Sequence, residues 1–240
     1  MVGHSLEVLY EDEALLIVEK PAGLHTAPLV EGEPDTLLAL VLGAFPEISS
    51  VPGMKPSEPG LLHRLDRDTS GVVVIARTRA AFASLRLQFA SGQVRKEYHA
   101  ACACRADSLP LRDISIRSLF APAGPGGRKV RVVMPEEKSA RLLRRTAPAL
   151  YRTEARLEKV HEGRALVEAV IQKGFRHQVR AHLAFTGLPI FGDPLYGVPV
   201  PPGAPQRMYL HASAVLLAHP VTGDELRITS PLPQAFSAVL

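Results

Sequence analysis

The sequence His63-Arg64-Leu65-Asp66-Arg67-Asp68-Thr69-Ser70-Gly71, followed by Val72-Val73-Val74-Ile75-Ala76, decides the fold of this chain. The apolar run predicts a short core strand, and the charged stretch leads directly into it. Charged groups beside a core strand cost solvation energy unless they are paired or put to use. Thr69 and Ser70 suit a turn, and Gly71 suits the entry into the strand. On spacing alone, Asp66 is more often a turn former than a catalytic group.

The composition describes an ordinary globular protein with no membrane segment. The chain has 240 residues, of which 46% are hydrophobic and 22% are charged, so it can bury one substantial core. No apolar run approaches the roughly 20 residues that span a bilayer. The residues Met1-Val2-Gly3-His4-Ser5 lack the basic and then apolar pattern of a signal peptide. We therefore expect a cytoplasmic protein without a membrane partner.

The net charge of +4 weakly favours binding to polyanions such as nucleic acids. The basic residues gather in two stretches. A solvated basic face and a phosphate-binding surface both fit this pattern. The first stretch contains Arg141, Arg144, Arg145 and Arg152, and the second contains Lys173, Arg176 and Arg180.

Cofactor and metal sites are not indicated. Cys102 and Cys104 lie two apart in an expected strand, which favours buried thiols over a disulfide or a zinc site. No glycine-rich phosphate loop follows a strand, so a nucleotide cofactor is not expected.

Alternating apolar residues and turn signals predict strands over 6–10, 14–19, 94–104, 152–160, 165–171, 208–217 and 225–228. Helices are expected over 35–45, capped by Asp35, over 78–92, capped by Thr78 and ended by Gly92, and over 176–186, with Gly187 as its stop. Residues 46–60 and 105–129 are rich in Pro and Gly and are expected on the surface. The pattern favours an α+β fold with a mixed, mainly antiparallel sheet and helices packed outside.

The opening segment resembles the catalytic signature of RluA-like pseudouridine synthases, matching at His63, Arg64, Leu65, Asp66, Thr69, Ser70 and Gly71. The resemblance implies that Asp66 is the nucleophile that attacks the target uridine nucleoside. A second block, Gly174-Phe175-Arg176-His177-Gln178-Val179-Arg180, resembles the family segment whose last Arg pairs with that Asp, which implies Arg180 as its partner. A solvated surface ion pair is the alternative for Arg180. Phe175 and Arg176 depart from the family pattern, where an Arg and a small polar residue or Lys are usual.

The resemblance extends to further residues. It implies that Tyr98, on the strand face of Ala100 and Cys102, lies close to the target base and assists proton removal at carbon 5; a core aromatic is the alternative. It implies that Arg64 fills the space left by the flipped base, with pairing to Asp68 as the alternative. Further RNA contacts are expected from Arg176, Lys20 and His177, although His177 also suits a structural part.

Weaker matches to the same family lie around Lys20-Pro21-Ala22-Gly23-Leu24, at 189–197, at Leu210-His211-Ala212 and at His219-Pro220. The resemblance therefore spans about 6–236, interrupted at 105–150. It implies one catalytic domain over 1–240 with a central RNA-binding cleft and no separate N-terminal RNA-binding domain.

The expected function is an RNA pseudouridine synthase that isomerises uridine in structured ribosomal or transfer RNA, with base flipping. The resemblance implies a monomer without cofactor or metal. A catalytically silent RNA-binding or RNA-folding factor of the same fold is the alternative, and an intact Asp66, Tyr98 and Arg180 argues against it. A hydrolase using Asp66 with His63 is a second alternative, for which no activated water site or metal cluster is visible.

Overall fold

A computed structural model describes residues 5–30, 33–104 and 113–240. The chain divides into two compact units. Unit 1 comprises Met1–Lys96 and His211–Leu232, and unit 2 comprises Glu97–Leu210 and Pro233–Leu240. The expectation of one catalytic domain with a central cleft concerns both units together and stays a prediction.

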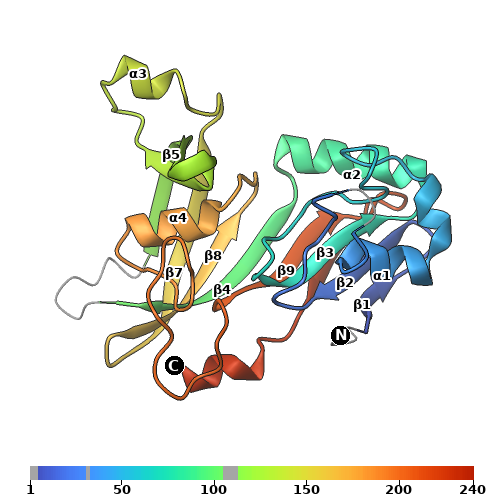
Figure 1. The fold of residues 1–240 in the computed structure, drawn as a ribbon. Helices are drawn as coiled ribbons and strands as arrows, with labels where there is room; N and C mark the ends of the chain where they lie inside the picture. Colours follow the sequence, from blue (N-terminus) through green and yellow to red (C-terminus); the bar gives the residue numbers. More distant parts are fainter. Residues whose placement is uncertain (1–4, 31–32, 105–112) are drawn as a thin grey trace. The chain divides into compact units, whose positions relative to one another are not determined.

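Unit 1 is built on paired strands that include the predicted core strand (Figure 1). Strands β1 (Glu7–Glu11), β2 (Leu15–Lys20) and β3 (Ser70–Ala76) pair antiparallel in this order. The start of β3 pairs in parallel with β9 (Leu210–Ala218), and β10 (Glu225–Thr229) pairs antiparallel with β9. All seven residues of β3 are buried, as the apolar run predicts.

Helix α2 (Arg79–Ser91) covers one face of this sheet. Its Phe82 and Leu85 pack with Ile17 and Val74 in the core of unit 1. As predicted, the Thr78 side chain accepts a hydrogen bond from the Ala81 N–H and Gly92 ends the helix in the left-handed conformation. Both ends of the helix therefore follow from local sequence.

Helix α1 (Leu37–Ala44) and the segment after it differ from expectation. The N-cap is Thr36, whose Oγ1 accepts from the Ala39 N–H at 3.1 Å, and not Asp35. Residues 46–60 are not simply an exposed connection, because the 3-10 helix η1 (Pro46–Ser50) buries Ile48 completely and Glu58 is also buried. A single buried apolar residue such as Ile48 produces no periodic pattern in the sequence, whereas the Pro and Gly content of 46–60 indicates a surface loop.

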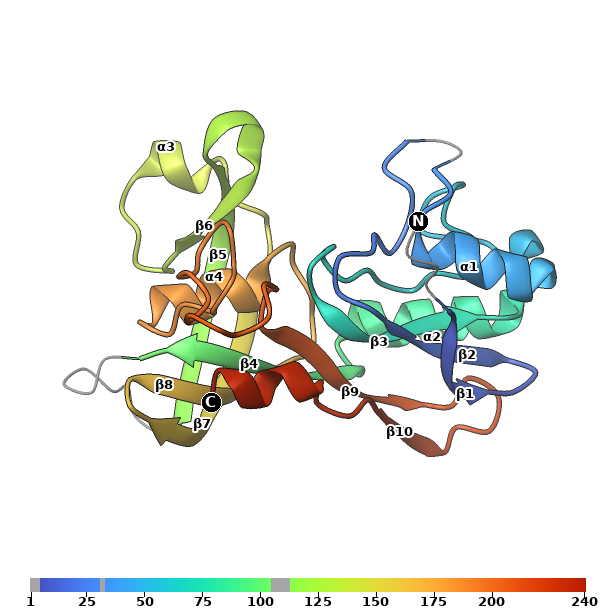
Figure 2. The ribbon, with the colours of Figure 1, turned by 60° about the horizontal axis from the view of Figure 1, so that its bottom comes forward.

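The strands of unit 2 follow one another in the order β4-β8-β7-β5-β6 (Figure 2). The strands are β4 (Arg95–Ala103), β8 (Arg164–Ile171), β7 (Tyr151–His161), β5 (Asp113–Ala123) and β6 (Lys129–Val133). The predicted β7–β8 hairpin is confirmed, and its turn residues Glu162 and Gly163 both have positive φ.

The expectation of irregular surface chain over 105–129 is wrong for β5, which spans 113–123, while 105–112 lie outside the described residues. The alternating buried residues Ile116, Ser118 and Phe120 carry a strand period that the surrounding Pro and Gly residues mask. The remaining helical elements of this unit are α3 (Ala140–Leu143), α4 (Gln178–Phe185), η3 (Pro125–Gly127) and η4 (Gln234–Ala238).

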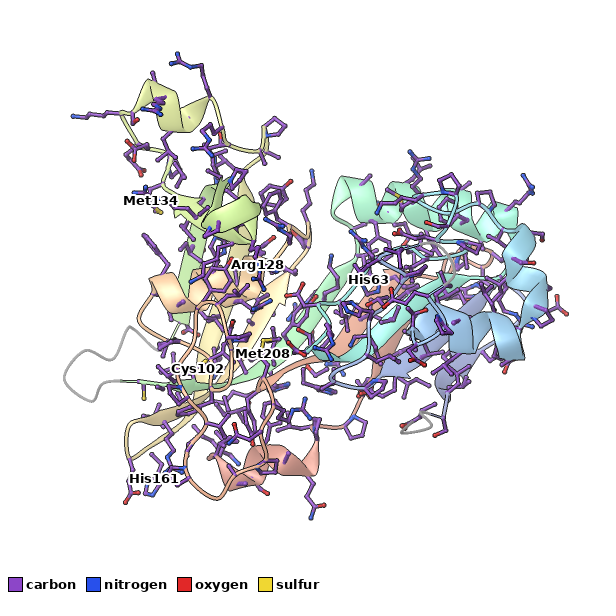
Figure 3. All side chains as sticks on the ribbon, in the orientation of Figure 1. His63, Cys102, Arg128, Met134, His161 and Met208 are labelled. Atoms are coloured by element: carbon purple, nitrogen blue, oxygen red, sulfur yellow. The ribbon has the colours of Figure 1, made fainter. Side chains whose placement is uncertain are left out.

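The α+β class with a mainly antiparallel sheet is confirmed. Cys102, labelled in Figure 3, and Cys104 are buried free thiols, as expected. In the part of the chain that the structure describes, no helix is long and apolar enough to cross a membrane.

Gly71 is the residue on which the Asp66 segment enters β3, and its replacement by alanine is expected to destabilise the protein by about 3 kcal/mol or more. Its φ is +118°, and an added Cβ would lie 2.1 Å from the Ala212 carbonyl oxygen. Denaturant unfolding measures the loss. The control is Gly43→Ala in α1, where a Cβ meets nothing within 4 Å, so a gain of about 0.5–1 kcal/mol is expected. Equal effects of the two substitutions would contradict the prediction.

Candidate active site

The loop that carries Asp66 is held on both sides of that residue. Before it, Thr26 Oγ1 donates to the Leu65 carbonyl at 2.8 Å and accepts from the Leu65 N–H at 3.1 Å. After it, the Thr69 N–H donates to the Asp66 carbonyl at 3.1 Å and closes a turn. Leu65 is buried and Asp66 is half-buried. The backbone therefore presents the Asp66 carboxylate from a fixed position at the surface of unit 1.

Lys20 supports this loop from inside. Its side chain is fully buried, and its ammonium donates to the carbonyls of Pro21, Leu24 and Arg67 at 2.7–2.9 Å. Arg67 Nε in turn donates to the Gly23 carbonyl at 3.0 Å. The charge of Lys20 therefore stabilises the loop from within, and its expected RNA contact stays a prediction.

His63 has a structural role in unit 1. Its Nε2 accepts from the Val74 N–H at 3.0 Å, and its ring stacks on Phe89 at 5.3 Å (His63 is labelled in Figure 3). Desolvation, with a smaller contribution from the charge of Lys96, lowers the pKa of His63 to about 3. The ring is therefore neutral near pH 7, and it is an acceptor from the strand.

Because the folded state holds His63 neutral, its contribution to stability is present above the ordinary pKa of 6.5 and is lost as pH falls toward about 3. The His63→Gln variant keeps an acceptor but cannot titrate in this range. We expect its free energy of unfolding to depend less on pH between 6.5 and 4 than that of the wild type. Parallel pH profiles of the two proteins in denaturant titrations would contradict this.

Arg64 is exposed, and its partner differs from the expected alternative. Its Nη1 lies 3.3 Å from Oε1 of the buried Glu58, to which Lys55 Nζ also approaches at 3.4 Å. Pairing with Asp68 is not the arrangement found. The guanidinium is fastened at one nitrogen beside the Asp66 loop, and its expected RNA contact stays a prediction.

A buried polar network joins the start of β3 to the C-terminal strands of unit 1. His211 is fully buried, with Nδ1 2.9 Å from Ser70 Oγ and Nε2 3.1 Å from Ser230 Oγ. Buried polar groups that are hydrogen-bonded in this way fix local geometry. The Ser70 end of the catalytic signature is therefore held by a residue 141 positions away.

In unit 2, Arg180 forms a buried bidentate ion pair with Asp193. Arg180 Nε lies 2.8 Å from Oδ2 and Nη2 lies 2.7 Å from Oδ1, and both side chains are almost completely enclosed. Burial alone raises the pKa of Asp193, but hydrogen bonds and the charge of Arg180, with the N–H groups of Leu195 and Tyr196, bring the net pKa below its usual value. The alternative of a solvated surface pair is therefore wrong for Arg180.

Tyr196 is a platform for the same guanidinium. The Arg180 Cζ lies 5.4 Å from the centroid of the Tyr196 ring, a distance at which a cation and an aromatic face attract. The Tyr196 hydroxyl accepts from the Val130 N–H at 2.6 Å and lies 3.0 Å from His177 Nδ1. Asp193 and Tyr196 together orient Arg180 before any substrate arrives.

His177, which precedes α4, has a left-handed backbone with φ of 58°, and its side chain makes no capping hydrogen bond. Its ring faces Tyr196, so it contributes to the contacts around Arg180. The expected RNA contact by His177 stays a prediction.

The two departures from the family pattern have a local explanation. Phe175 stacks on Phe120 at 5.0 Å and contacts Tyr151 at 4.9 Å, so it fills an apolar cluster between α4 and the sheet. Arg176 Nη2 donates to the carbonyls of Gly127 at 2.5 Å and Lys129 at 3.3 Å. Arg176 therefore links the β5–β6 hairpin to the start of α4 through hydrogen bonds. Its expected RNA contact stays a prediction.

Tyr98 lies on β4 and is 7% exposed, with Ala100 and Cys102 fully buried on the same strand. This burial fits a core aromatic as well as a residue that meets a base at the surface. Asp66 belongs to unit 1, and Tyr98 and Arg180 belong to unit 2. The predicted meeting of these three residues therefore stays a prediction.

The sequence did not predict that Asp193 and Tyr196 contact Arg180, or that Ser70 contacts His211. A signal was present, because Gly192-Asp193-Pro194 and Tyr196-Gly197 were among the weaker family matches. Among residues 5–30, 33–104 and 113–240, no group of three or more His, Cys, Asp or Glu side chains is arranged to hold a metal ion.

A family model described as RNA pseudouridylate synthase matches residues 14–185. The ribosomal large subunit pseudouridine synthase D of Pseudomonas aeruginosa is 33% identical over 96% of this chain and 69% of its own length. An uncharacterised RNA pseudouridine synthase of Synechocystis is 33% identical over 98% of this chain and 68% of its own length. The chain thus spans about two thirds of these relatives.

Among solved structures, the human RNA pseudouridylate synthase domain containing 4 superposes with a TM-score of 0.72 at 23% identity, over 98% of this chain and 91% of that one. This likeness establishes that the chain has the fold of pseudouridylate synthase domains. With the sequence matches, the conclusion is more specific: the chain belongs to the RNA pseudouridylate synthase family. It is accordingly an isomerase, an RNA pseudouridine synthase.

Proposed function

We propose that this enzyme isomerises uridine in ribosomal RNA, with Asp66 as the nucleophile. The observation that carries the proposal is the loop around Asp66, which contains the complete His-Arg-Leu-Asp signature and is hydrogen-bonded on both sides of the carboxylate. Relatives named for the large ribosomal subunit support ribosomal RNA as the substrate class.

In the proposed reaction the Asp66 carboxylate attacks the target nucleoside and the bond between the ribose and N1 of uracil breaks. The base rotates and carbon 5 joins the ribose, the bond to Asp66 breaks and frees its carboxylate, the proton on carbon 5 leaves and N1 gains a proton. Tyr98 assists the removal of the carbon-5 proton. Because a base inside folded RNA is stacked, it must first be flipped out at a cost of a few kcal/mol, and Arg64 fills the space it leaves.

Arg180 supplies the cation that keeps the nucleophile ionised. An opposite charge near a carboxylate favours its charged form, and a guanidinium held in one orientation does so without a cost of reorganisation. The Asp193 and Tyr196 contacts support this part, since they hold Arg180 before RNA binds. The proposal requires Asp66, Tyr98 and Arg180 to act on the same uridine. It further takes the enzyme to be a monomer in the cytoplasm, the compartment in which ribosomal RNA is made and assembled.

The test is pseudouridine formation on defined RNAs. The purified protein is incubated with transcripts of large-subunit ribosomal RNA and, separately, with transfer RNA, and new pseudouridines are mapped by chemical modification and primer extension. We expect modification of a small number of uridines in the ribosomal transcript. Modification of transfer RNA alone would overturn the substrate class. Tight RNA binding with no pseudouridine on either RNA would instead support the silent RNA-binding factor.

A further inference from the structure

Lys96, at the start of β4, has no counter-charge among residues 5–30, 33–104 and 113–240. The side chain is 7% exposed. Its Nζ lies over the ring of Phe89 at 5.4 Å from the centroid, and Phe89 stacks in turn on His63, three residues before Asp66. The three side chains form a layered group of unit 1, here called the Lys96 stack.

Within the described part of the chain, Lys96 Nζ makes no hydrogen bond or ion pair, and its neighbours are the Phe89 face and the neutral ring of His63. The contrast with Lys20 is direct, because that buried ammonium satisfies its donors with three carbonyls. Although Lys96 Nζ has no hydrogen-bond partner among the described residues, it is not fully enclosed, so it keeps some contact with solvent. The ammonium therefore remains open to an acceptor from outside.

A buried cation without a partner is costly, because it loses hydration and gains no opposing charge. This cost is the reason that burial lowers the pKa of Lys96 to about 8. An aromatic face offsets part of the loss, yet it provides no hydrogen-bond acceptor. The arrangement fits a site whose acceptor arrives with the substrate. Phosphate is the group of RNA that carries a negative charge and accepts hydrogen bonds at once.

We propose that Lys96 is the binding site for one backbone phosphate oxygen of the RNA, next to the segment that carries Asp66. The inference rests on the proposed function in that the substrate is RNA. The place along the chain supports it: Lys96 precedes Tyr98 by two residues on β4, and alternate residues of a strand project to the same face. The Lys96 stack thus touches His63 of the catalytic signature and shares a strand with Tyr98.

A first experiment separates this role from a structural one by the Lys96→Met variant, which keeps the volume and removes the charge. For the free protein we expect an unchanged or slightly raised melting temperature, because a poorly compensated charge is removed. For RNA binding, measured with the Asp66→Asn protein so that no turnover occurs, we expect about a tenfold loss of affinity. The slope of log affinity against log salt should become shallower by about 0.7–1.

The matched control is Lys159→Met, on the exposed part of β7, which removes the same charge from a solvated position. We expect it to change the affinity by less than about twofold. A lower melting temperature for Lys96→Met together with unchanged RNA affinity would overturn the proposal and leave Lys96 as a structural residue.

A second experiment locates the acceptor. RNA oligonucleotides are made with a single uncharged methylphosphonate linkage, moved one position at a time around the target uridine. One linkage should weaken binding to the Lys96 protein about tenfold and have little effect on the Lys96→Met protein. Equal sensitivity of both proteins at every linkage would show that Lys96 meets no phosphate.

These measurements report binding, so they do not depend on the nucleophile. If the wild-type protein binds no RNA, the proposed function itself is contradicted. If the wild type binds and modifies RNA and the Lys96→Met protein binds it with unchanged affinity, only the proposed phosphate site is contradicted.

Discussion

Replacing Asp66 with asparagine is expected to lower the rate of isomerisation by more than about 10⁴-fold, because the amide has neither the charge nor the nucleophilicity of the carboxylate. The side chain keeps its shape, and the loop is held by backbone groups of Leu65 and Asp66 that the substitution does not touch. RNA affinity should therefore be retained or slightly increased. Release of tritium from RNA labelled at carbon 5 of uridine measures the reaction, and filter binding measures the affinity.

The control for this experiment is Asp68→Asn, two residues further along the same loop and also half-buried. It removes a similar charge from the same surface, so its activity should stay within about tenfold of the wild type. Tritium release by the Asp66→Asn protein at a rate close to that of Asp68→Asn would refute the assignment of the nucleophile. It would leave the family and the fold untouched, since both rest on the whole chain.

Replacing Asp193 with asparagine is expected to lower the free energy of unfolding by about 3–5 kcal/mol, because it removes the carboxylate charge from a buried bidentate pair with Arg180. The pair is bidentate and both side chains are almost completely enclosed, so water cannot replace the lost charge. Denaturant unfolding at constant salt gives the difference. Activity should fall as well, since Arg180 is no longer held in one orientation.

The matched control is Asp113→Asn, which breaks the exposed pair of Asp113 with Arg156 in the same unit, at 3.9 Å. Exposed pairs contribute little, so its stability should be indistinguishable from that of the wild type. The double variant Arg180→Met/Asp193→Leu should recover most of the lost stability while remaining inactive. A destabilisation of Asp193→Asn no larger than that of Asp113→Asn would contradict the proposed importance of the buried pair.

The same pair makes a prediction about pH. The folded state holds the pKa of Asp193 below its ordinary value, so its contribution to stability is present above the ordinary carboxyl pKa and is lost as pH falls through the lowered one. The Asp193→Asn protein lacks this contribution at every pH. The stability difference between the two proteins should therefore shrink under acidic conditions.

Features that depend on neighbouring residues could be predicted from the sequence. Strand β3 follows from an unbroken apolar run, α2 from a Thr cap and a terminal Gly, and the β7–β8 turn from Glu162-Gly163. These patterns reflect dihedral preferences and the periods of helices and strands, which act within a few residues. The Asp66 signature is local in the same sense, so it identified the family before any contact was known.

Features that depend on partners distant in the sequence needed the tertiary structure. Two lysines illustrate this: Lys20 is enclosed by three carbonyls, and Lys96 rests on an aromatic face, although neither sequence context distinguishes a buried lysine from an exposed one. The Asp193 partner of Arg180 and the His211 partner of Ser70 are likewise contacts across the fold.

Short-range patterns in the sequence are sufficient to predict the fold class and the family, and they point to Asp66 as the expected nucleophile. The tertiary structure alone decided which charges are paired, which are buried and which are left to meet a substrate. The physical reason is that the energy of a charge depends on its surroundings in space, and those are assembled by folding from residues far apart along the chain.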